Sequence, residues 1–310
     1  MKKFEFIAKS KYFIAGSIMI ILLGFIMVFV HKGFNMGLDF TGGSLITLDM
    51  GKTFSEKDIS DAFAKNGIKE IQITTSGTSA SKTTALVRMK TMEDGSKETE
   101  LRAEVITELK KTYPKISMTS VERVGGVASG EMIESAVSAA LIACLLMLIY
   151  ITFRFELLSG IAAVIALLHD MLIMLAFMAI FDLTLNSSFV AAVLTIFGYS
   201  INDTIVVFDR IRENRNRLSR REYTFEMVAN RSIRETMTRS INTSVTTLMT
   251  ISVLYVLGVA SIKEFALPII VGLISGTYSS ILIAAPIWVW LYDKPFFSKR
   301  HKSEMKYKKA

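Results

Sequence analysis

Cysteine and histidine are scarce in this 310-residue sequence, which contains one cysteine, Cys144, and three histidines. A single cysteine can form neither an intramolecular disulfide nor a thiolate metal cluster, so a disulfide-stabilised secreted domain is excluded. Charge is also missing, but only in places: six stretches of 19 to 28 residues together contain two charges, Asp170 and Asp203. A soluble enzyme spreads its charges over its whole length, and a disordered chain has few apolar residues, so this pattern excludes both classes.

The uncharged stretches are long enough to cross a membrane. A helix of roughly 18 or more apolar residues spans a bilayer core of about 30 Å, and 51% of this chain is hydrophobic. The six stretches are residues 12–30, 135–153, 157–181, 183–208, 240–262 and 265–292. Small residues at helical spacing, such as Gly272 and Gly276, predict close packing between helices in lipid. We therefore predict a polytopic α-helical membrane protein with six transmembrane helices.

The net charge of +8 is distributed in a way that predicts orientation. Basic residues concentrate at the N-terminus, in the nine arginines of residues 209–239 and in the seven lysines and arginines after residue 292. Short cytoplasmic loops are enriched in lysine and arginine, so both termini are expected in the cytoplasm. We attribute the basic surplus to orientation and to anionic lipids of the bilayer, and we expect no nucleic-acid partner.

This orientation divides the chain into four parts. A cytoplasmic N-terminus and the first transmembrane helix, interpreted as an uncleaved anchor, occupy residues 1–30, and an extracytoplasmic domain follows over 31–130. Helices two to six occupy 131–292 and include a cytoplasmic Arg-rich loop at 209–239, where periodic apolar residues predict a short interfacial helix. A basic cytoplasmic tail covers 293–310.

Strand-like alternation and helical periodicity succeed one another within the extracytoplasmic segment. Ser55, with Asp58 three residues later, is typical of a helix start. The predicted elements are a strand at 44–50, a helix from 55 to 67, strands at 70–75 and 84–89, a helix ending before 114, and a strand at 116–124. This β-α-β-β-α-β order is the ferredoxin-like arrangement, so we predict one α+β domain between helices one and two.

The same segment offers little catalytic chemistry. Residues 44–124 contain no histidine, no cysteine and no carboxylates that their spacing would bring together. We therefore expect no enzyme active site, no metal site and no cofactor. Binding or mechanical coupling is the favoured role for this domain.

Two glycine-rich motifs flank the domain. The first, GLDFTGG, follows the first helix, and glycine permits positive φ and close backbone approach. We favour a tight structural turn over a ligand site here. The residues of this turn motif are Gly37, Asp39, Gly42 and Gly43. The second motif, GGVASG at 125–130, lacks the Lys-Ser/Thr of a phosphate-binding loop, and we predict a hinge.

Charged residues inside transmembrane helices carry the strongest functional signal. An ionised aspartate at a helix centre costs about 2.5–3.5 kcal/mol on insertion scales, so it is expected beside a partner or a wet cavity. Asp170 follows His169 near the middle of the third helix. Asp203 follows Asn202 in the cytoplasmic half of the fourth helix, and Arg239, at the start of the fifth, could pair with it.

These charged residues support two interpretations. Burial raises the pKa of a carboxylate and a nearby arginine lowers it, so an arginine that approaches and withdraws makes an acid bind and release a proton. The alternative is a static ion pair or hydrogen bond that only fixes helix packing. The candidate relay residues are Asp203, Arg239, Asp170, Asn202 and His169. Asp203 is the strongest of them, and His169 is more readily explained as a packed polar neighbour.

Five motifs together resemble the SecF family, a group of bacterial protein-export subunits within the RND superfamily. The motifs are GLDFTGG after the first helix, Leu-His-Asp at 168–170, GYSINDTIVVFDRIREN at 198–214, the NTS-TT pattern from Asn242, and PIIVGLISGTYSS at 268–280. The resemblance covers residues 1–292. The chain departs from the family pattern at 125–130, where a Gly-Pro is expected and Gly125-Gly126 stands instead.

The resemblance implies a subunit without ATPase activity in the cytoplasmic (inner) membrane. Together with SecD it would use the protonmotive force to complete export of unfolded preproteins through the SecYEG channel. An aspartate and an arginine of the family matter for proton flow, and by motif they fall on Asp203 and Arg239. A further essential aspartate belongs to SecD, so this chain would be an RND half-unit; the coupling ion, H⁺ or Na⁺, stays open.

Two other functions stay open at this point. An RND-type exporter half for small molecules or lipids should carry a second exported domain, or a longer one with pockets, and the sequence contains neither. A non-transporting scaffold that stabilises the translocon would tolerate Asp203→Asn, which a proton carrier would not.

Overall fold

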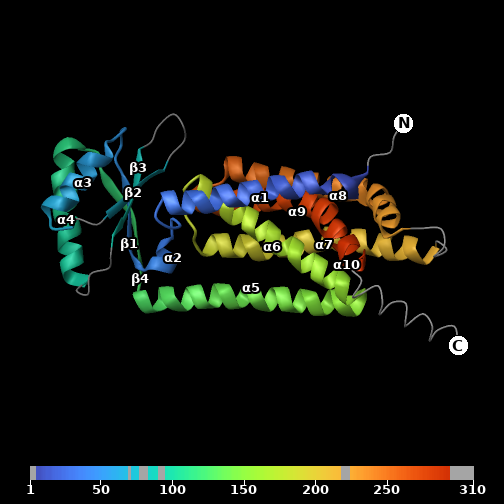
Figure 1. Cartoon of the computed structure of the whole chain (residues 1–310). Helices are drawn as coiled ribbons and strands as arrows, with labels where there is room; N and C mark the ends of the chain where they lie inside the picture. Colours follow the sequence, from blue (N-terminus) through green and yellow to red (C-terminus); the bar gives the residue numbers. More distant parts are fainter. Residues whose placement is uncertain (1–4, 69–70, 77–82, 90–94, 218–223, 294–310) are drawn as a thin grey trace. The chain divides into compact units, whose positions relative to one another are not determined.

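The computed structural model describes residues 5–68, 71–76, 83–89, 95–217 and 224–293. The chain forms two compact units, residues 36–137 and the remainder of the chain. Figure 1 shows the smaller unit as a sheet with helices beside it and the larger unit as a bundle of long helices.

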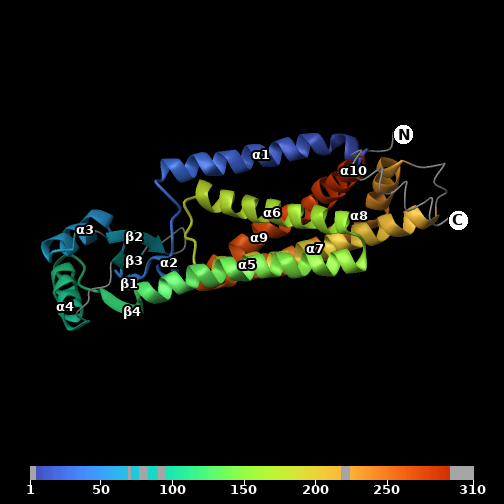
Figure 2. The same ribbon diagram turned by 60° about the horizontal axis from the view of Figure 1, so that its bottom comes forward.

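The smaller unit contains a four-stranded antiparallel sheet. Its elements are the short helix α2 (Leu38–Thr41), β1 (Gly43–Asp49), α3 (Glu56–Lys65), β2 (Ile71–Ser76), β3 (Thr84–Met89), α4 (Gly95–Thr112) and β4 (Ser117–Val124). The strands lie in the order β2-β3-β1-β4, and α3 and α4 pack on one face of the sheet (Figure 2). The predicted β-α-β-β-α-β order and ferredoxin-like arrangement are confirmed.

Alternation along the strands places apolar side chains beneath the two helices. Ile46 and Leu48 of β1 and Val87 of β3 are buried in the core of this unit. The helix α3 begins as predicted at Ser55, whose hydroxyl accepts a 3.3 Å hydrogen bond from the backbone N–H of Lys57. The smaller unit therefore has a core of its own, as a separate domain requires.

The GLDFTGG motif forms a tight connection into this sheet. Gly37 precedes α2, and Asp39 lies in the first turn of that helix. Gly42 and Gly43 have φ values of +65° and +126°, conformations that favour glycine. A Cβ atom at Gly43 would lie 2.5 Å from the carbonyl oxygen of Met89, so the close approach of β1 to β3 requires a glycine there.

Six helices in the described part of the chain are long and apolar enough to cross a membrane. They are α1 (Phe6–Val30), α5 (Gly126–Arg154), α6 (Leu157–Ile180), α7 (Ser187–Arg217), α8 (Phe225–Leu257), and a sixth made of α9 (Ala260–Ser279), the π-helical turn η1 (Ser280–Ala284) and α10 (Ala285–Asp293). The prediction of six transmembrane helices is confirmed.

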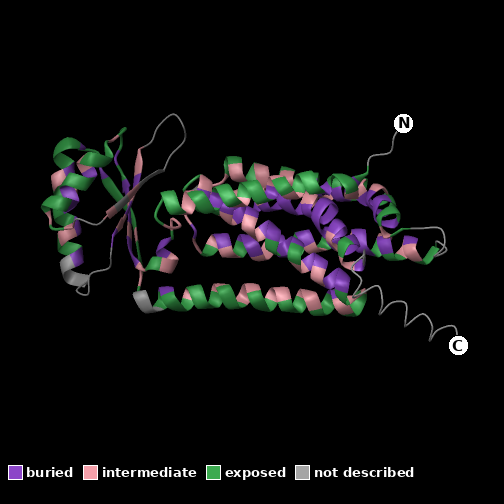
Figure 3. Cartoon of the chain, in the orientation of Figure 1, coloured by how far each residue is buried: buried purple, intermediate pink, exposed green. Residues whose placement is uncertain are grey.

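The six helices differ in how deeply they are buried (Figure 3). Of the most apolar part of the sixth helix, 67% is buried, compared with 11% for α1 and α8 and 6% for α5. The first part of the sixth helix, α9, packs against α6, α7 and α8. The polar side chains on the facing sides of α6, α7, α8 and α9 therefore lie in one shared interior of the helix bundle.

Glycines allow α9 to lie close to α7. A Cβ atom at Gly272 would lie 2.5 Å from Cγ1 of Ile196, and one at Gly276 would lie 3.1 Å from Cβ of Ser200. The close packing predicted for these small residues is confirmed. It brings the polar side chains of the two helices within hydrogen-bonding range.

The segment 209–239 is not the loop that its arginines predicted. Helix α7 continues to Arg217 and α8 begins at Phe225, so most of the segment consists of two helix ends. The expected short interfacial helix is the first part of α8, and Arg239 lies inside α8 rather than at its start. Arginine and glutamate are good helix formers, and their pairs four residues apart stabilise helices beyond the apolar stretch.

The hinge predicted at 125–130 is also wrong. Gly126 begins α5, which continues without interruption to Arg154. A glycine costs about 1 kcal/mol in a helix interior, and a helix of 29 residues tolerates that cost at its first turns. Helix two therefore begins at residue 126 instead of the predicted 131.

Candidate functional site

Asp203 lies on the buried side of α7, with only 6% of its surface exposed. The Ser244 hydroxyl on α8 donates a long hydrogen bond of 3.5 Å to its Oδ2 atom. Thr277 on α9 is hydrogen-bonded to Ser244 at 2.7 Å, and Ser240, one turn before Ser244, also faces the carboxylate. Hydroxyl groups, and no cation in direct contact, therefore surround Asp203 within the described residues.

A small cavity of about 10 Å³ adjoins this carboxylate between α7, α8 and α9. That volume is close to what a single water molecule needs. We call it the Asp203 cavity, and it is lined by Ile196, Tyr199, Ser200, Asp203, Thr243, Ser244, Thr247, Gly272, Leu273, Gly276 and Thr277. A buried acid beside a space of this size can exchange a proton with one water molecule.

Arg239 does not form the direct ion pair that its sequence position suggested. Within the described residues no ion pair of 4.0 Å or less joins it to Asp203, although its charge acts on that carboxylate from further away. Arg239 is exposed on α8, about 100° around the helix from Ser240. Because Ser240 faces Asp203, Arg239 begins on a different face of α8 and is outside direct contact with the carboxylate.

Asn202 is likewise separated from the cavity. It follows Ile201 on the exposed side of α7, about 100° around the helix from Asp203. Within the described residues its side chain makes no hydrogen bond to the hydroxyl groups around Asp203. Asn202 does not line the Asp203 cavity, whereas Tyr199, about one turn before it, does so with 44% of its surface exposed. Asn202 and Asp203, although adjacent in sequence, therefore face different surroundings.

Asp170 occupies the centre of a polar cluster and is fully buried. Its Oδ2 atom accepts hydrogen bonds from Ser200 on α7 (2.6 Å) and Ser279 on α9 (2.9 Å). Its Oδ1 atom accepts one from Ser275 on α9 (2.7 Å). We call Asp170 and these three serines the Asp170 cluster, and it connects α6 to α7 and α9.

His169 and Tyr278 extend this cluster toward α1. The Nδ1 atom of His169 lies 3.1 Å from Asp170 Oδ1, and its Nε2 atom lies 3.1 Å from the Tyr278 hydroxyl. The two rings meet edge to face, with their centroids 5.5 Å apart. The Tyr278 hydroxyl in turn lies 3.0 Å from the hydroxyl of Ser17 on α1. Both ring nitrogens of His169 are therefore engaged.

The serine partners of Asp170 were missed from the sequence, whereas Ser244, the partner of Asp203, lies in the polar pattern that follows Arg239. Ser275 and Ser279 are four residues apart within an uncharged stretch, so they lie on one face of α9, and this spacing could have identified them. Ser200 lies three residues before Asp203 on α7; it donates to Asp170 and also lines the Asp203 cavity. Ser200 therefore connects the two carboxylate sites.

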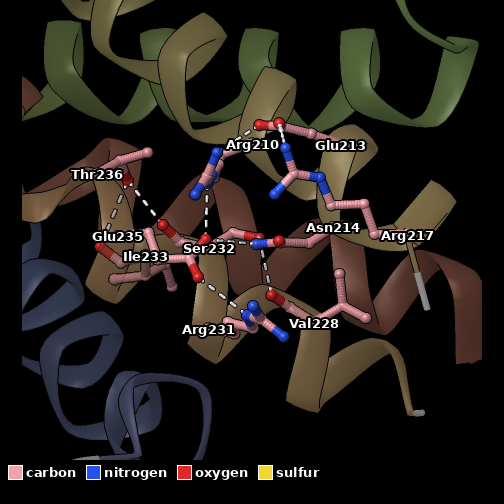
Figure 4. A network of polar contacts seen from close by, with 10 residues as sticks. All are labelled: Arg210, Glu213, Asn214, Arg217, Val228, Arg231, Ser232, Ile233, Glu235 and Thr236. Carbon is pink, nitrogen blue, oxygen red and sulfur yellow. Dashed lines mark hydrogen bonds and ion pairs between the residues drawn. The ribbon is translucent and has the colours of Figure 1, made fainter. Parts of the chain in front are cut away.

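A polar network joins the end of α7 to the start of α8 (Figure 4). Glu235 accepts hydrogen bonds from Arg210 (2.6 Å), from Arg231 (2.9 Å) and from Asn214 (2.8 Å). Asn214 also donates to Ser232 at 3.0 Å. We call these five residues the arginine clamp. It fixes the two helices that provide the Asp203 carboxylate and its serine partners.

Other arginines hold the turn between α5 and α6 against α7. Arg215 pairs with the Glu156 carboxylate and donates to the Tyr292 hydroxyl at 3.2 Å. Arg154 pairs with Asp209 at 3.4 Å. Several of the arginines that were attributed to orientation and lipid contact therefore also make contacts within the chain.

The smaller unit has polar contacts both at its surface and in its interior, where the fully buried Glu98 pairs with Arg102 and Arg123. Hydrogen bonds from Lys111 and from Lys65 lower the pKa of Glu108 to about 2. The Tyr113 hydroxyl donates to Asp58 at 2.6 Å, and burial raises the pKa of Tyr113. Among the described residues of the whole chain, no three histidine, cysteine, aspartate or glutamate side chains lie together as metal ligands would.

Comparison with known families identifies the chain as a relative of protein-export proteins. The family described as protein export membrane protein SecD/SecF, C-terminal, matches residues 104–294, and the SecD/SecF GG motif matches residues 28–53. The chain belongs to the SecD/SecF family. The protein translocase subunit SecF of Petrotoga mobilis is 36% identical over 304 residues, covering 95% of this chain and 98% of the relative. The corresponding subunit of Sebaldella termitidis is 34% identical over 302 residues, covering 97% and 94%.

Solved structures agree with this family. The crystal structure of SecDF, a translocon-associated membrane protein from Thermus thermophilus, is 34% identical and superposes with a TM-score of 0.84 over 94% of this chain. A crystal structure of SecDF in a super-membrane-facing form is 32% identical, with a TM-score of 0.65. The chain spans 39% and 40% of those two chains. It is thus a multi-pass membrane protein with a SecF-like role in protein translocation.

Proposed function

We propose that this chain is one half of a cation-driven export motor, in which Asp203 carries the coupling proton and Arg239 is its movable counter-charge. The observation that supports this proposal is a buried carboxylate whose hydrogen-bond partner is a hydroxyl 3.5 Å away, beside a cavity for about one water molecule. An unpaired buried charge is costly. The acid therefore needs either a proton or the approach of a cation.

A static ion pair would fit this geometry poorly. Breaking a buried pair costs about 3–5 kcal/mol, so an arginine whose role was structural should lie within bonding distance of the acid. Arg239 instead lies beyond 4.0 Å on the exposed side of α8. A rotation or shift of α8 would bring the guanidinium to the carboxylate and displace a bound proton, because the nearby positive charge favours the ionised acid.

A second membrane half would cover the exposed polar residues of α7 and α8. Asn202 on α7 and Arg239, Asn242 and Thr246 on α8 are exposed within the transmembrane helices. Polar and charged groups at that depth are expensive in contact with lipid. We propose that SecD provides this cover, since the SecDF chain in which this chain finds its counterpart is more than twice as long.

In the proposed complex the chain lies in the cytoplasmic membrane with both termini in the cytoplasm. The domain at residues 31–130 then faces outward, where it acts on an unfolded preprotein that leaves the SecYEG channel. A membrane potential supplies about 2.3 kcal/mol per charge per 100 mV. The alternation of Asp203 between its two partners, a proton and Arg239, would convert that energy into helix movement without nucleotide hydrolysis.

The direct test replaces Asp203 by asparagine in the assembled complex. Asp203→Asn preserves shape but cannot take up a proton, so gradient-driven export should fall to the rate seen without a gradient. Asp209→Asn is the matched control, because Asp209 lies on the same helix but is exposed and paired with Arg154. Its export rate should stay within about twofold of the original, as is usual for a surface substitution.

Two results would contradict the proposal. Retained gradient-driven export in Asp203→Asn would exclude this residue as the carrier and favour a scaffold role. Equal losses in both variants would show that the effect is not specific to the buried carboxylate. Assembly of the complex, followed by co-purification of the SecD half in mild detergent, establishes that each variant is measured in the intact complex.

A further inference from the structure

A chain of hydrogen bonds connects α1 to the buried carboxylate of Asp170. The bonding atoms of successive members are 3.0, 3.1 and 3.1 Å apart. We call Ser17, Tyr278 and His169, in this order from α1, the relay. We propose that Asp170 is a second proton acceptor in the membrane unit and that the relay delivers its proton from α1. This inference rests on the proposed function in one respect, because the gradient invoked there supplies the proton.

The carboxylate sets the direction of every bond in the relay. An ionised carboxylate only accepts hydrogen bonds, so the Nδ1 atom of His169 carries the hydrogen and donates it to Asp170. The Nε2 atom of a neutral imidazole is then an acceptor, and the Tyr278 hydroxyl donates to it. The Ser17 hydroxyl donates to Tyr278 in turn. All three hydrogen bonds therefore point from α1 toward the acid.

A proton can move along this chain without leaving a charge within it. A proton that binds the Ser17 oxygen allows Ser17 to pass its own hydrogen to Tyr278, which passes its hydrogen to Nε2 of His169. The imidazole then transfers its Nδ1 hydrogen to Oδ1 of Asp170. Each relay atom that loses a hydrogen on one side gains one on the other. The net change is a neutral Asp170 and the opposite imidazole tautomer.

A structural brace would not need the relay. The serines of the Asp170 cluster already hold α6 against α7 and α9 through three hydrogen bonds. The relay adds three groups that can each donate and accept a hydrogen, which is the property that proton transfer requires. Ser17 is 4% exposed and His169 is 9% exposed, and Tyr278 between them is partly buried, so the relay lies mostly within the protein interior.

Few other titratable groups face Asp170 in the described structure. On its own helix it meets His169, and α9 presents Tyr278 through that histidine, whereas α1 presents only a serine hydroxyl at this point. On α7 it meets the hydroxyl of Ser200, and the nearest charged residue of that helix is Asp203, one turn further. The turn η1 contains no titratable residue, and those of α10 are Tyr292 and Asp293 at its end.

The position of Ser200 gives the second proton an exit. Ser200 donates to Asp170 and also lines the Asp203 cavity. A proton released from the Asp170 cluster can therefore reach the water-sized cavity that adjoins Asp203. The two acids would act in series, with the relay as an entrance that the Asp203 site alone does not provide.

The test is infrared difference spectroscopy on the assembled complex in membranes after a rapid acid step. A protonated buried aspartate gives its own carbonyl stretching band, which Asp170→Asn should abolish. Tyr278→Phe keeps the ring but removes the hydroxyl, so the same band should appear about tenfold more slowly or slower still, with unchanged final amplitude. Ser17→Ala should slow it as well. Tyr150→Phe, an exposed tyrosine on α5, is the matched control and should behave as the original protein does.

The possible outcomes separate this inference from the proposed function. Persistence of the band in Asp170→Asn, or an unchanged rate in both Tyr278→Phe and Ser17→Ala, would overturn the relay. Loss of the band on addition of sodium at constant pH would also overturn it, because the site would then hold a metal cation. If Asp203→Asn keeps gradient-driven export while the Asp170 band behaves as described, the proposed function fails and the relay stands.

Discussion

Asp170 and Asp203 are both buried carboxylates within transmembrane helices, but their surroundings differ in kind. Asp170 accepts three short hydrogen bonds from serines and one from an imidazole. Asp203 accepts one long bond from Ser244 and adjoins a small cavity. All hydrogen-bond partners of Asp170 are in place, so a proton would reach it through fixed groups, whereas Asp203 depends on a partner that can approach and withdraw. The comparison teaches that burial alone does not define the role of a membrane aspartate.

The largest predicted effect concerns the stability of the two sites. Asp170→Leu leaves the buried hydroxyls of Ser200 and Ser275 without an acceptor and that of Ser279 with only the Gly276 carbonyl. At about 1–3 kcal/mol for each unsatisfied hydroxyl, the free energy of unfolding should fall by about 3 kcal/mol or more. Asp203→Leu removes one long bond and should cost about 1 kcal/mol or less. Thermal denaturation of the purified complex in detergent measures both. Equal losses in the two variants would mean that the two sites do not differ as described.

An intermediate effect is expected from the arginine clamp. Glu235→Gln weakens two hydrogen bonds that join α7 to α8, from Arg210 and Asn214, and one from Arg231 within α8. Hydrogen bonds to charged groups contribute about 1.5–3 kcal/mol each. The serine partner of Asp203 is on α8, so a loosened α8 should reduce gradient-driven export severalfold. The serine partners of Asp170 are on α7 and α9, so the infrared band of Asp170 should stay unchanged. Glu226→Gln, in the exposed first turn of α8, is the control. A shift in the Asp170 band would show that the two sites are not independent of the clamp in this way.

The smallest effect is expected at Glu108, a partly exposed carboxylate of the smaller unit that serves as a reference for the buried aspartates. The pKa of Glu108, about 2 because of hydrogen bonds from Lys111 and Lys65, lies below its ordinary value of 4.5. Because the pKa of Glu108 is lower in the folded chain than in the unfolded chain, its ionised carboxylate adds to the free energy of unfolding above pH 4.5. That added stability is lost as the pH falls from about 4.5 to about 2 and the carboxylate becomes protonated. Hydrogen exchange in α3 and α4 of the full chain should therefore accelerate slightly over that range.

The control for this effect is Glu108→Gln, in which the acceleration between pH 4.5 and pH 2 should be absent. Salt should reduce it in the original chain, because exposed charges are screened. An identical pH profile in Glu108→Gln and in the original chain would show that Glu108 does not cause the acceleration. A buried aspartate such as Asp203 should by contrast respond little to salt.

Most of the fold could be predicted from sequence patterns. The apolar stretches predict the transmembrane helices because a helix needs that length to cross a bilayer. Alternation of apolar residues such as Ile46 and Leu48 predicts the strands of the smaller unit. The continuation of α7 and α8 beyond the apolar stretches was missed, because hydropathy does not detect helices held by pairs such as Arg231 with Glu235. The start of α5 at Gly126 was missed because a glycine-rich motif is typical of a turn or loop between helices and strands.

The candidate site was only half visible in the sequence. Asp170 and Asp203 stand out because a charge in an apolar stretch is costly. The serine partners of Asp170 do not stand out, since a serine such as Ser200 is common in membrane helices and its hydrogen bond depends on how three helices are rotated. The rotation of α8 also leaves Arg239 exposed and out of direct contact with Asp203, which spacing along the chain could not reveal.

Proton flux through the reconstituted complex reports directly whether Asp203 carries the coupling proton. Vesicles that contain a pH-sensitive dye report the flux driven by an imposed gradient while a preprotein is being exported. The account predicts that the flux through Asp203→Asn falls to the level of vesicles without the complex, while Asp209→Asn conducts like the original protein. An undiminished flux through Asp203→Asn would contradict it.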